Sequence, residues 1–234
     1  MRRSWLDITR LAVAFSVIVA LSAWSCRAAA AETIDLLKAK NLALWKLKGD
    51  AAKSNWKRGK AALADNASEL KTGDGDELVN AKGAGVDIFT EQNFGDALVE
   101  LEVMVPKGSN SGVYLMGEYE VQVFDSFGKK DVGMGDMGAI YGTAVPKTNA
   151  SKAPGEWQKY SISYRAPRFD AAGKKTEHAK ILKVVLNDQV LHENVEVKGP
   201  TLGSLTGKEA ATGPLMFQGD HGAVAYRNVK VTPQ

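Results

Sequence analysis

The stretch Ala97-Leu-Val-Glu-Leu-Glu-Val-Met-Val105 alternates apolar and acidic residues with a period of two. Successive side chains of an extended strand point to opposite faces, so Glu100 and Glu102 share one face and the apolar side chains flanking them share the other. The alternation predicts a strand with one face in a hydrophobic core and one in water. Pro106 follows directly and ends the strand, because it has no backbone donor.

Shorter strand-like segments recur on both sides of this one, and turn-forming residues such as Gly117 and Asn187-Asp188 separate them. Helix is sparse, with some helical character only in residues 34–40 and 61–70. The pattern predicts an all-β, two-sheet sandwich. The further strand-like segments are residues 112–116, 119–124, 160–164, 181–186, 190–197, 215–218 and 224–231.

Residues 1–31 have the pattern of a cleavable signal peptide. Arg2, Arg3 and Arg10 precede the uncharged apolar run Leu11–Trp24. After the run, small residues at 28–31 fit a cleavage site after Ala31. The run is shorter than the roughly 20 residues that a membrane-spanning helix needs. We therefore expect export to the periplasm or the cell exterior, with no membrane attachment after cleavage and a single mature domain at residues 32–234.

Cleavage after Ala31 would change the composition of the protein. It removes four arginines and one aspartate, so the formal net charge falls from +3 to zero. No excess positive charge then remains to attract nucleic acid or an anionic membrane. The only cysteine, Cys26, is also lost, which excludes disulfides and thiolate chemistry in the mature domain. A lipoprotein modified at Cys26 is the alternative, although Trp24 stands where such signals have small residues.

The densest polar cluster is Tyr119-Glu-Val-Gln-Val-Phe-Asp-Ser126, where Glu120, Gln122 and Phe124 would share one strand face. A carboxylate, an amide and an aromatic ring on one face could bind a sugar, and a solvated outer face is the alternative. The cluster leads into residues 127–151, rich in Gly, Asp and Asn, which predict one long ordered loop. Loops of that length in compact domains tend to be functional.

His221 lies in Phe217-Gln-Gly-Asp-His-Gly222, where flanking glycines favour an exposed turn. An exposed histidine can act as an acid, a base or a metal ligand, and a simple turn residue is the alternative. Trp45, Trp56 and Trp157 could be sugar platforms, but tryptophans in a small β domain are more often core anchors. Nucleophile-elbow, P-loop and His-Glu-x-x-His motifs do not occur.

Several motifs, in order and register over residues 85–232, resemble those of the 3-keto-disaccharide hydrolase-like domain family. The resemblance implies a concanavalin-like jelly roll: two antiparallel sheets, the concave one lined with polar residues. The matching stretches are Asn110-Ser-Gly-Val-Tyr-Leu115, Tyr119-Glu-Val-Gln-Val-Phe-Asp-Ser126, Gly138-Ala-Ile-Tyr-Gly142, Ala153-Pro-Gly-Glu-Trp-Gln158, Ala166-Pro-Arg-Phe-Asp170, Leu186-Asn187, Gly213-Pro-Leu-Met-Phe-Gln218, His221-Gly222 and Tyr226-Arg-Asn-Val229.

The resemblance also implies an exported carbohydrate-active hydrolase or lyase that acts on glycosides oxidised at C3 of the sugar. Carried over by position, it makes Glu120, Asp125 and His221 the catalytic candidates. The same three side chains could hold one divalent metal ion of unknown identity, acting as a Lewis acid at the ketone. The candidates for substrate binding are Asn110, Gln122, Tyr141, Gln218 and Arg227.

Two positions depart from the expected pattern. Related sequences often read Leu-Gln-Asp-His-Gly near the end, and here Gly219 is inserted before Asp220. In a regular strand Arg227 would share a face with Val229, so a salt bridge at the edge of the core is an alternative role for it.

Two other classes of protein remain open. A non-catalytic carbohydrate-binding module would show an aromatic platform on the concave face. A scaffold or envelope-interaction domain would show a broad apolar patch.

Overall fold

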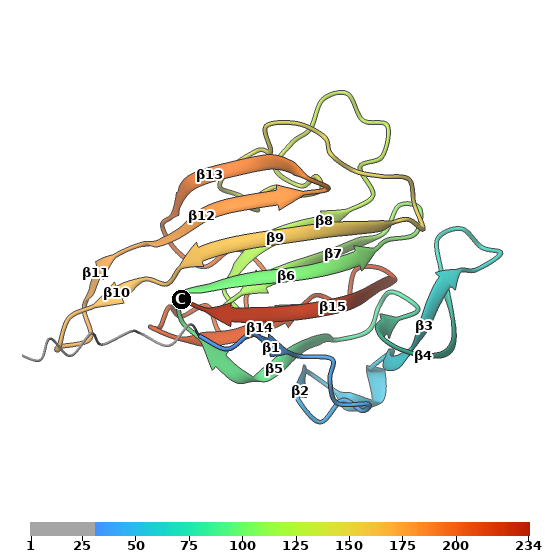
Figure 1. The fold of residues 1–234 in the computed structure, drawn as a ribbon, viewed down its shortest axis with the longest axis horizontal. Helices are drawn as coiled ribbons and strands as arrows, with labels where there is room; N and C mark the ends of the chain where they lie inside the picture. Colours follow the sequence, from blue (N-terminus) through green and yellow to red (C-terminus); the bar gives the residue numbers. More distant parts are fainter. Residues whose placement is uncertain (1–30) are drawn as a thin grey trace, which may run out of the picture. The chain divides into compact units, whose positions relative to one another are not determined.

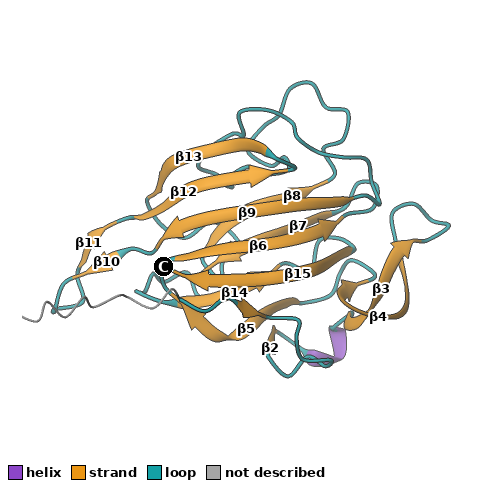
Figure 2. Ribbon diagram, viewed as in Figure 1, coloured by secondary structure: helices purple, strands orange, loops and turns teal. Residues whose placement is uncertain are grey.

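A computed structural model describes residues 31–234, which form one compact unit. The predicted signal peptide, apart from its last residue, lies outside the described residues. Every strand pair in this unit is antiparallel, and the only helix within it is the three-residue 3-10 turn η1, Ala51–Lys53 (Figure 1, Figure 2). None of the helical structure in residues 31–234 is long and apolar enough to cross a membrane.

The strands form two main sheets and a small hairpin. The eight-stranded sheet has the order β13-β12-β9-β6-β15-β4-β3, with β1 also paired to β15, and the five-stranded sheet has the order β2-β5-β14-β7-β8. The expected two-sheet jelly-roll sandwich is thus confirmed. The strands are β1 (Ile34–Asp35), β2 (Trp45–Lys48), β3 (Trp56–Leu63), β4 (Leu70–Asn80), β5 (Asp87–Phe94), β6 (Ala97–Met104), β7 (Asn110–Leu115), β8 (Tyr119–Phe124), β9 (Trp157–Arg165), β10 (Arg168–Phe169), β11 (Lys175–Glu177), β12 (Ala179–Leu186), β13 (Gln189–Val197), β14 (Gly213–Phe217) and β15 (Val224–Pro233).

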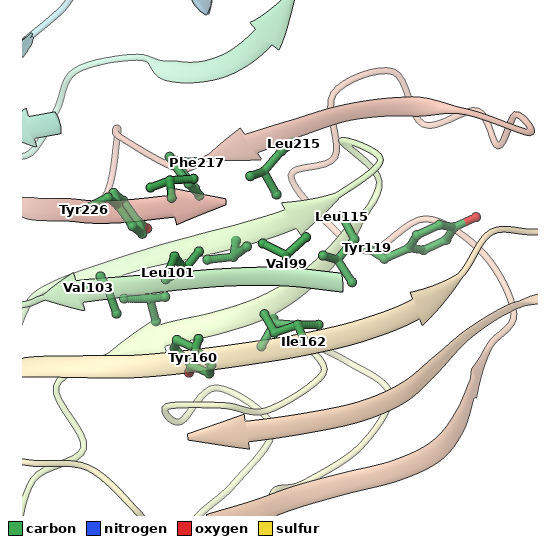
Figure 3. Packing of buried hydrophobic residues seen from close by; sticks show 14 of the residues in the cluster. Val99, Leu101, Val103, Leu115, Tyr119, Tyr160, Ile162, Leu215, Phe217 and Tyr226 are labelled. Atoms are coloured by element: carbon green, nitrogen blue, oxygen red, sulfur yellow. The ribbon is translucent and has the colours of Figure 1, made fainter. Parts of the chain in front are cut away.

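The core fills the space between the two sheets (Figure 3). Val99, Leu101 and Val103 of β6 lie in it, almost fully buried, whereas Glu100 and Glu102 remain partly exposed on the opposite face, as the alternation predicts. Across the sandwich, Phe217 of β14 stacks on Tyr226 of β15 with ring centroids 3.9 Å apart. This contact joins the two sheets, and Phe217 directly precedes the candidate residue Gln218.

The predicted helical character of residues 34–40 and 61–70 is wrong. Residues 34–35 form β1, and residues 61–70 contain the end of β3, a turn and the start of β4. Ala61 and Leu70 pack with Met104 of β6 in a second apolar cluster, and this packing outweighs the weak helical propensity of the segment.

Two of the three tryptophans anchor the core, as expected. Trp45 and Trp56 are buried at the starts of β2 and β3, whereas Trp157 is half-buried at the start of β9.

A loop of residues 125–156 joins β8 to β9 and contains the predicted loop. The Asp136 carboxylate organises it by accepting hydrogen bonds from the Ser126 hydroxyl (2.8 Å), the Lys129 ammonium (2.6 Å) and the Gly133 N–H (2.7 Å). Burial alone would raise the pKa of Asp136, but these donors bring it below its usual value. The loop is therefore fixed by its own side chains.

Candidate functional site

The outward face of the five-stranded sheet carries a polar pocket of about 100 Å³. Along β8, Tyr119, Val121 and Val123 face the core, so the alternate side chains Glu120 and Gln122 face the pocket. All the predicted site residues except Asp125 and Arg227 meet here. The lining residues are Asn110, Tyr114, Glu120, Gln122, Tyr141, Leu202, Gly203, Gln218 and His221.

Glu120 is the buried acid of the pocket, with only 3% of the residue exposed. Its carboxyl group lies over Gly112 of β7, where a Cβ atom would come within 2.9 Å of the Glu120 Cδ, so a larger residue at this position would displace the carboxyl group. Burial raises the pKa of Glu120 to about 7, although the Tyr114 hydroxyl and His221 oppose the shift. A carboxyl group with that pKa can take up or release a proton near neutral pH.

His221 is more exposed and is held by its neighbour Asp220, whose Oδ1 lies 2.5 Å from the His221 Nδ1. That contact leaves Nε2 of the imidazole for other partners. Steric crowding explains why position 219 is glycine, because a Cβ atom there would come within 2.6 Å of the Trp56 Nε1. The Gly219 N–H donates to the Asp87 Oδ1 at 3.0 Å, which fixes the chain entering the His221 turn.

Three amide side chains surround Glu120 with unused hydrogen-bonding capacity. The Asn110 Oδ1, Gln122 Oε1 and Gln218 Oε1 are buried and accept no hydrogen bond from the described part of the chain. A buried acceptor without a donor costs free energy, so such atoms in a folded protein indicate a missing partner. The three amide oxygens lie in one pocket and can each accept a further hydrogen bond.

The β8–β9 loop and the core hold Gln122 in place. Its Nε2 donates to the Gly135 carbonyl at 3.2 Å. Its backbone carbonyl accepts from the Tyr160 hydroxyl and from the Gly138 N–H, both at 2.8 Å. The pocket wall is thus built before any ligand arrives.

Tyr114, Leu202 and Gly203 also line the pocket but were not among the predicted site residues. Tyr114 could have been found, because it follows Asn110 and Gly112 on the same face of one strand. Leu202 and Gly203 belong to the loop between β13 and β14 and carry no sequence signal. Tyr114 donates to the Leu202 carbonyl at 3.1 Å, and Lys48 donates to the Gly203 carbonyl at 2.8 Å.

Asp125 does not reach the pocket, contrary to the sequence-based expectation. Its carboxylate instead accepts from the backbone N–H groups of Gly108 (2.8 Å) and Phe127 (3.3 Å). Asp125 therefore fixes the end of β8.

Arg227 lies on the other sheet, on the face of β15 away from the core. It donates to the Glu102 carboxylate at 2.6 Å and lies over the Trp157 ring at 4.2 Å from the centroid. The salt-bridge alternative is correct, but the predicted shared face is wrong, because the irregularity between Arg227 and Lys230 puts Arg227 on the face opposite the buried Val229. The substrate-binding prediction for Arg227 is not supported by its position.

The predicted metal ligands do not converge either. Among residues 31–234, no three His, Cys, Asp or Glu side chains are arranged to hold a metal ion. Since backbone N–H groups donate to the oxygens of Asp125, the side chains of Glu120, Asp125 and His221 do not fit a shared cation.

The fold and the pocket define a jelly-roll sandwich with a polar ligand site on the outward face of its smaller sheet. The chain belongs to the 3-keto-alpha-glucoside-1,2-lyase-like domain family, whose sequence profile matches residues 32–232. The family expected from the motifs is thereby confirmed. Among curated proteins, none matches this chain.

Two solved structures of similar fold come from the same bacterium. A "putative glycosyl hydrolase" from Parabacteroides distasonis ATCC 8503 is 28% identical, with a TM-score of 0.66 over 86% of this chain and 84% of that one. A second protein so described from the same organism is 18% identical, with a TM-score of 0.61 over 86% of this chain and 94% of that one. The second comparison supports the fold alone.

Proposed function

We propose that the protein is an exported enzyme that cleaves 3-keto-glycosides by elimination and hydration. The observation that carries the proposal is Glu120: a buried carboxyl group with a pKa of about 7, surrounded by three amide oxygens without donors. The family to which the chain belongs, and the description of its 28% identical relative as a glycosyl hydrolase, support a carbohydrate ligand.

The amide side chains would bind and orient the sugar. Asn110, Gln122 and Gln218 each offer a carbonyl oxygen that a sugar hydroxyl can satisfy. The amide N–H groups of Asn110 and Gln218 can donate to the C3 oxygen as it gains negative charge. At about 100 Å³ the pocket is smaller than the roughly 300–1,000 Å³ of typical ligand sites, so it suits one sugar ring rather than a whole disaccharide.

The chemistry begins with the C2 proton, which the C3 ketone makes acidic. Glu120, in its ionised form, takes this proton, and the electron pair of the C2–H bond passes into an enolate. The enolate then expels the substituent at C1, forming a C1=C2 double bond conjugated to the ketone. His221 gives a proton to the departing oxygen, with Asp220 holding its Nδ1. Water adds at C1 and a proton returns to C2, giving the free 3-keto sugar.

An enzyme is favoured over a carbohydrate-binding module by the chemistry of the lining. The pocket contains no Trp or Phe, and the Trp45 and Trp56 rings are buried in the core. Of the two tyrosines in the lining, Tyr114 is buried and only Tyr141 is partly exposed, so the pocket offers at most one ring face rather than a broad aromatic platform. The buried carboxyl group is costly for simple sugar binding but useful to a general base.

A single assay tests the proposal. Purified mature protein is incubated with 3-keto-trehalose, and with trehalose as the matched unoxidised control, in the presence and absence of a chelator. We expect glucose release from the keto sugar alone, with kcat/KM increasing through about pH 7 as Glu120 ionises. Equal cleavage of trehalose, or tight binding of both sugars without turnover, would contradict the elimination chemistry.

A further inference from the structure

A second pocket, of about 290 Å³, shares His221 with the first. His221 lines both pockets, and Ser109 of the second directly precedes Asn110 of the first. Both cavities therefore border His221. The lining residues of the second pocket are Ser68, Glu69, Lys82, Gly83, Lys107, Gly108, Ser109, His221, Gly222 and Ala223.

Backbone hydrogen bonds fix the walls of this second pocket. The Lys107 N–H donates to the Ala67 carbonyl at 2.9 Å, which ties the segment after β6 to the turn between β3 and β4 (Figure 1). The Ala84 N–H donates to the Asp220 carbonyl at 3.0 Å, which ties the segment after β4 to the His221 turn. Three segments that are distant in sequence thus form one cavity.

The charge of the second pocket is positive. Lys82 and Lys107 are exposed on its walls, and neither forms an ion pair within residues 31–234. Glu69 is the one acidic lining residue, and it also lacks an ion-pair partner in that part of the chain. The first pocket, by contrast, holds no lysine or arginine. The two cavities are therefore suited to chemically different parts of one ligand.

We propose that the second pocket binds the leaving group of the substrate and that this leaving group carries a carboxylate. The inference rests on the function proposed above. The neutral keto sugar occupies the amide-lined pocket, and the C1–O bond lies at His221, between the two cavities. The anionic part of the leaving group then lies between Lys82 and Lys107, as in a glycoside of a hydroxylated aromatic acid or of a uronic acid.

The size of the second pocket agrees with this division. It has nearly three times the volume of the first and reaches the lower end of typical ligand sites. Partly exposed charge pairs contribute modestly, so the lysines would select among substrates rather than provide most of the affinity. Together they should favour a carboxylate over its neutral amide by roughly fivefold at low salt.

Two isosteric substrates test the inference: the 3-keto-glucosides of 4-hydroxybenzoate and of 4-hydroxybenzamide. The measured quantity is the ratio of their kcat/KM values, compared between variants so that the different leaving-group reactivities cancel. We expect Lys82→Ala with Lys107→Ala to lower the ratio about fivefold and Glu69→Gln to raise it about twofold. Lys183→Ala, an exposed lysine on β12, is the matched control and should leave the ratio unchanged.

The outcomes separate the two proposals. If both substrates are cleaved and no variant changes the ratio of their kcat/KM values, the proposal of an anionic leaving group is overturned. The lyase proposal would remain intact. If neither compound nor 3-keto-trehalose is cleaved, the lyase proposal fails, and the ratio of Kd values for the two aryl compounds, measured by calorimetry, tests the anion site by itself. Cleavage of 3-keto-trehalose with no cleavage of either aryl compound would overturn the anionic leaving group. A Kd ratio that falls in the double lysine variant supports an anion site, and an unchanged one overturns it.

Discussion

Replacing Glu120 with glutamine should abolish turnover and, at the same time, stabilise the protein above neutral pH. Glutamine has the shape of the protonated carboxyl group but cannot accept the C2 proton, so the elimination has no base. It also removes a group that resists ionisation in the fold. The variant therefore separates the loss of activity from any loss of structure.

The size of the stability change follows from the pKa of Glu120. The pKa rises from 4.5 in an unfolded chain to about 7 in the native protein. Below pH 4.5 the group is protonated in both states, so it does not favour unfolding. Between pH 4.5 and 7 the unfolded chain releases a proton that the native protein retains, and the native state loses stability as the pH rises. At about 1.4 kcal/mol per unit, the loss is about 3 kcal/mol above pH 7.

Urea unfolding of both proteins at pH 4, 6 and 8 measures this effect. The variant and the wild-type protein should be close in stability at pH 4, and the variant should exceed the wild-type protein by up to about 3 kcal/mol at pH 8. In a domain of this size that corresponds to a Tm higher by roughly 6–12 °C.

Glu118→Gln is the matched control for this experiment. Glu118 is also buried, but it accepts hydrogen bonds from Thr206 and Gly207, so the same substitution there should destabilise the fold. Undiminished turnover in Glu120→Gln would remove Glu120 as the base. A stability difference that does not change with pH would refute the burial argument.

Four further changes test other parts of the structure. Asp136→Asn should lower the free energy of unfolding by about 1–3 kcal/mol at pH 7 and raise KM, because it loosens the loop beside the pocket. In acid the wild-type carboxylate is protonated, so the difference in stability measured by urea unfolding should become smaller. Gly112→Ala should inactivate the enzyme by displacing the Glu120 carboxyl group, and activity with intact far-UV circular dichroism would contradict the close contact. Arg227→Met should leave kcat/KM unchanged and lower the free energy of unfolding by about 1 kcal/mol. A large rise in KM would instead show that Arg227 contributes to substrate binding. Intact mass of the secreted protein should correspond to a chain that starts near Glu32, and a mass that retains the preceding residues would contradict cleavage there.

Much of the fold could be predicted because strands with one buried face leave a period-two pattern. The alternation in residues 97–105 predicts β6 and its core face, and Asn187-Asp188 predicts the turn between β12 and β13, where both residues have positive φ. Residues 61–70 could not be assigned in this way. Their alternation is weak, and the contact with Met104 that makes them strand comes from a distant part of the chain.

The candidate site shows the same limit. Glu120 and Gln122 share a face because they are two residues apart on one strand, so the sequence is sufficient to pair them. Asp125 and Arg227 have equally suitable chemistry but lie elsewhere, Asp125 because backbone donors capture its carboxylate and Arg227 because β15 belongs to the other sheet.

By itself, the sequence determined the alternating strands, the family and most of the residues around the pocket. Local periodicity suffices for the strands, because it depends on neighbours two residues apart, whereas the family and the residues around the pocket follow from the resemblance of motifs spread over residues 85–232. Only the tertiary structure decided that His221 borders two cavities, that Leu202 and Gly203 cover one of them, and that burial raises the pKa of Glu120. Desolvation and cavity shape are set by segments that are far apart in the chain and meet only when the sheets pack.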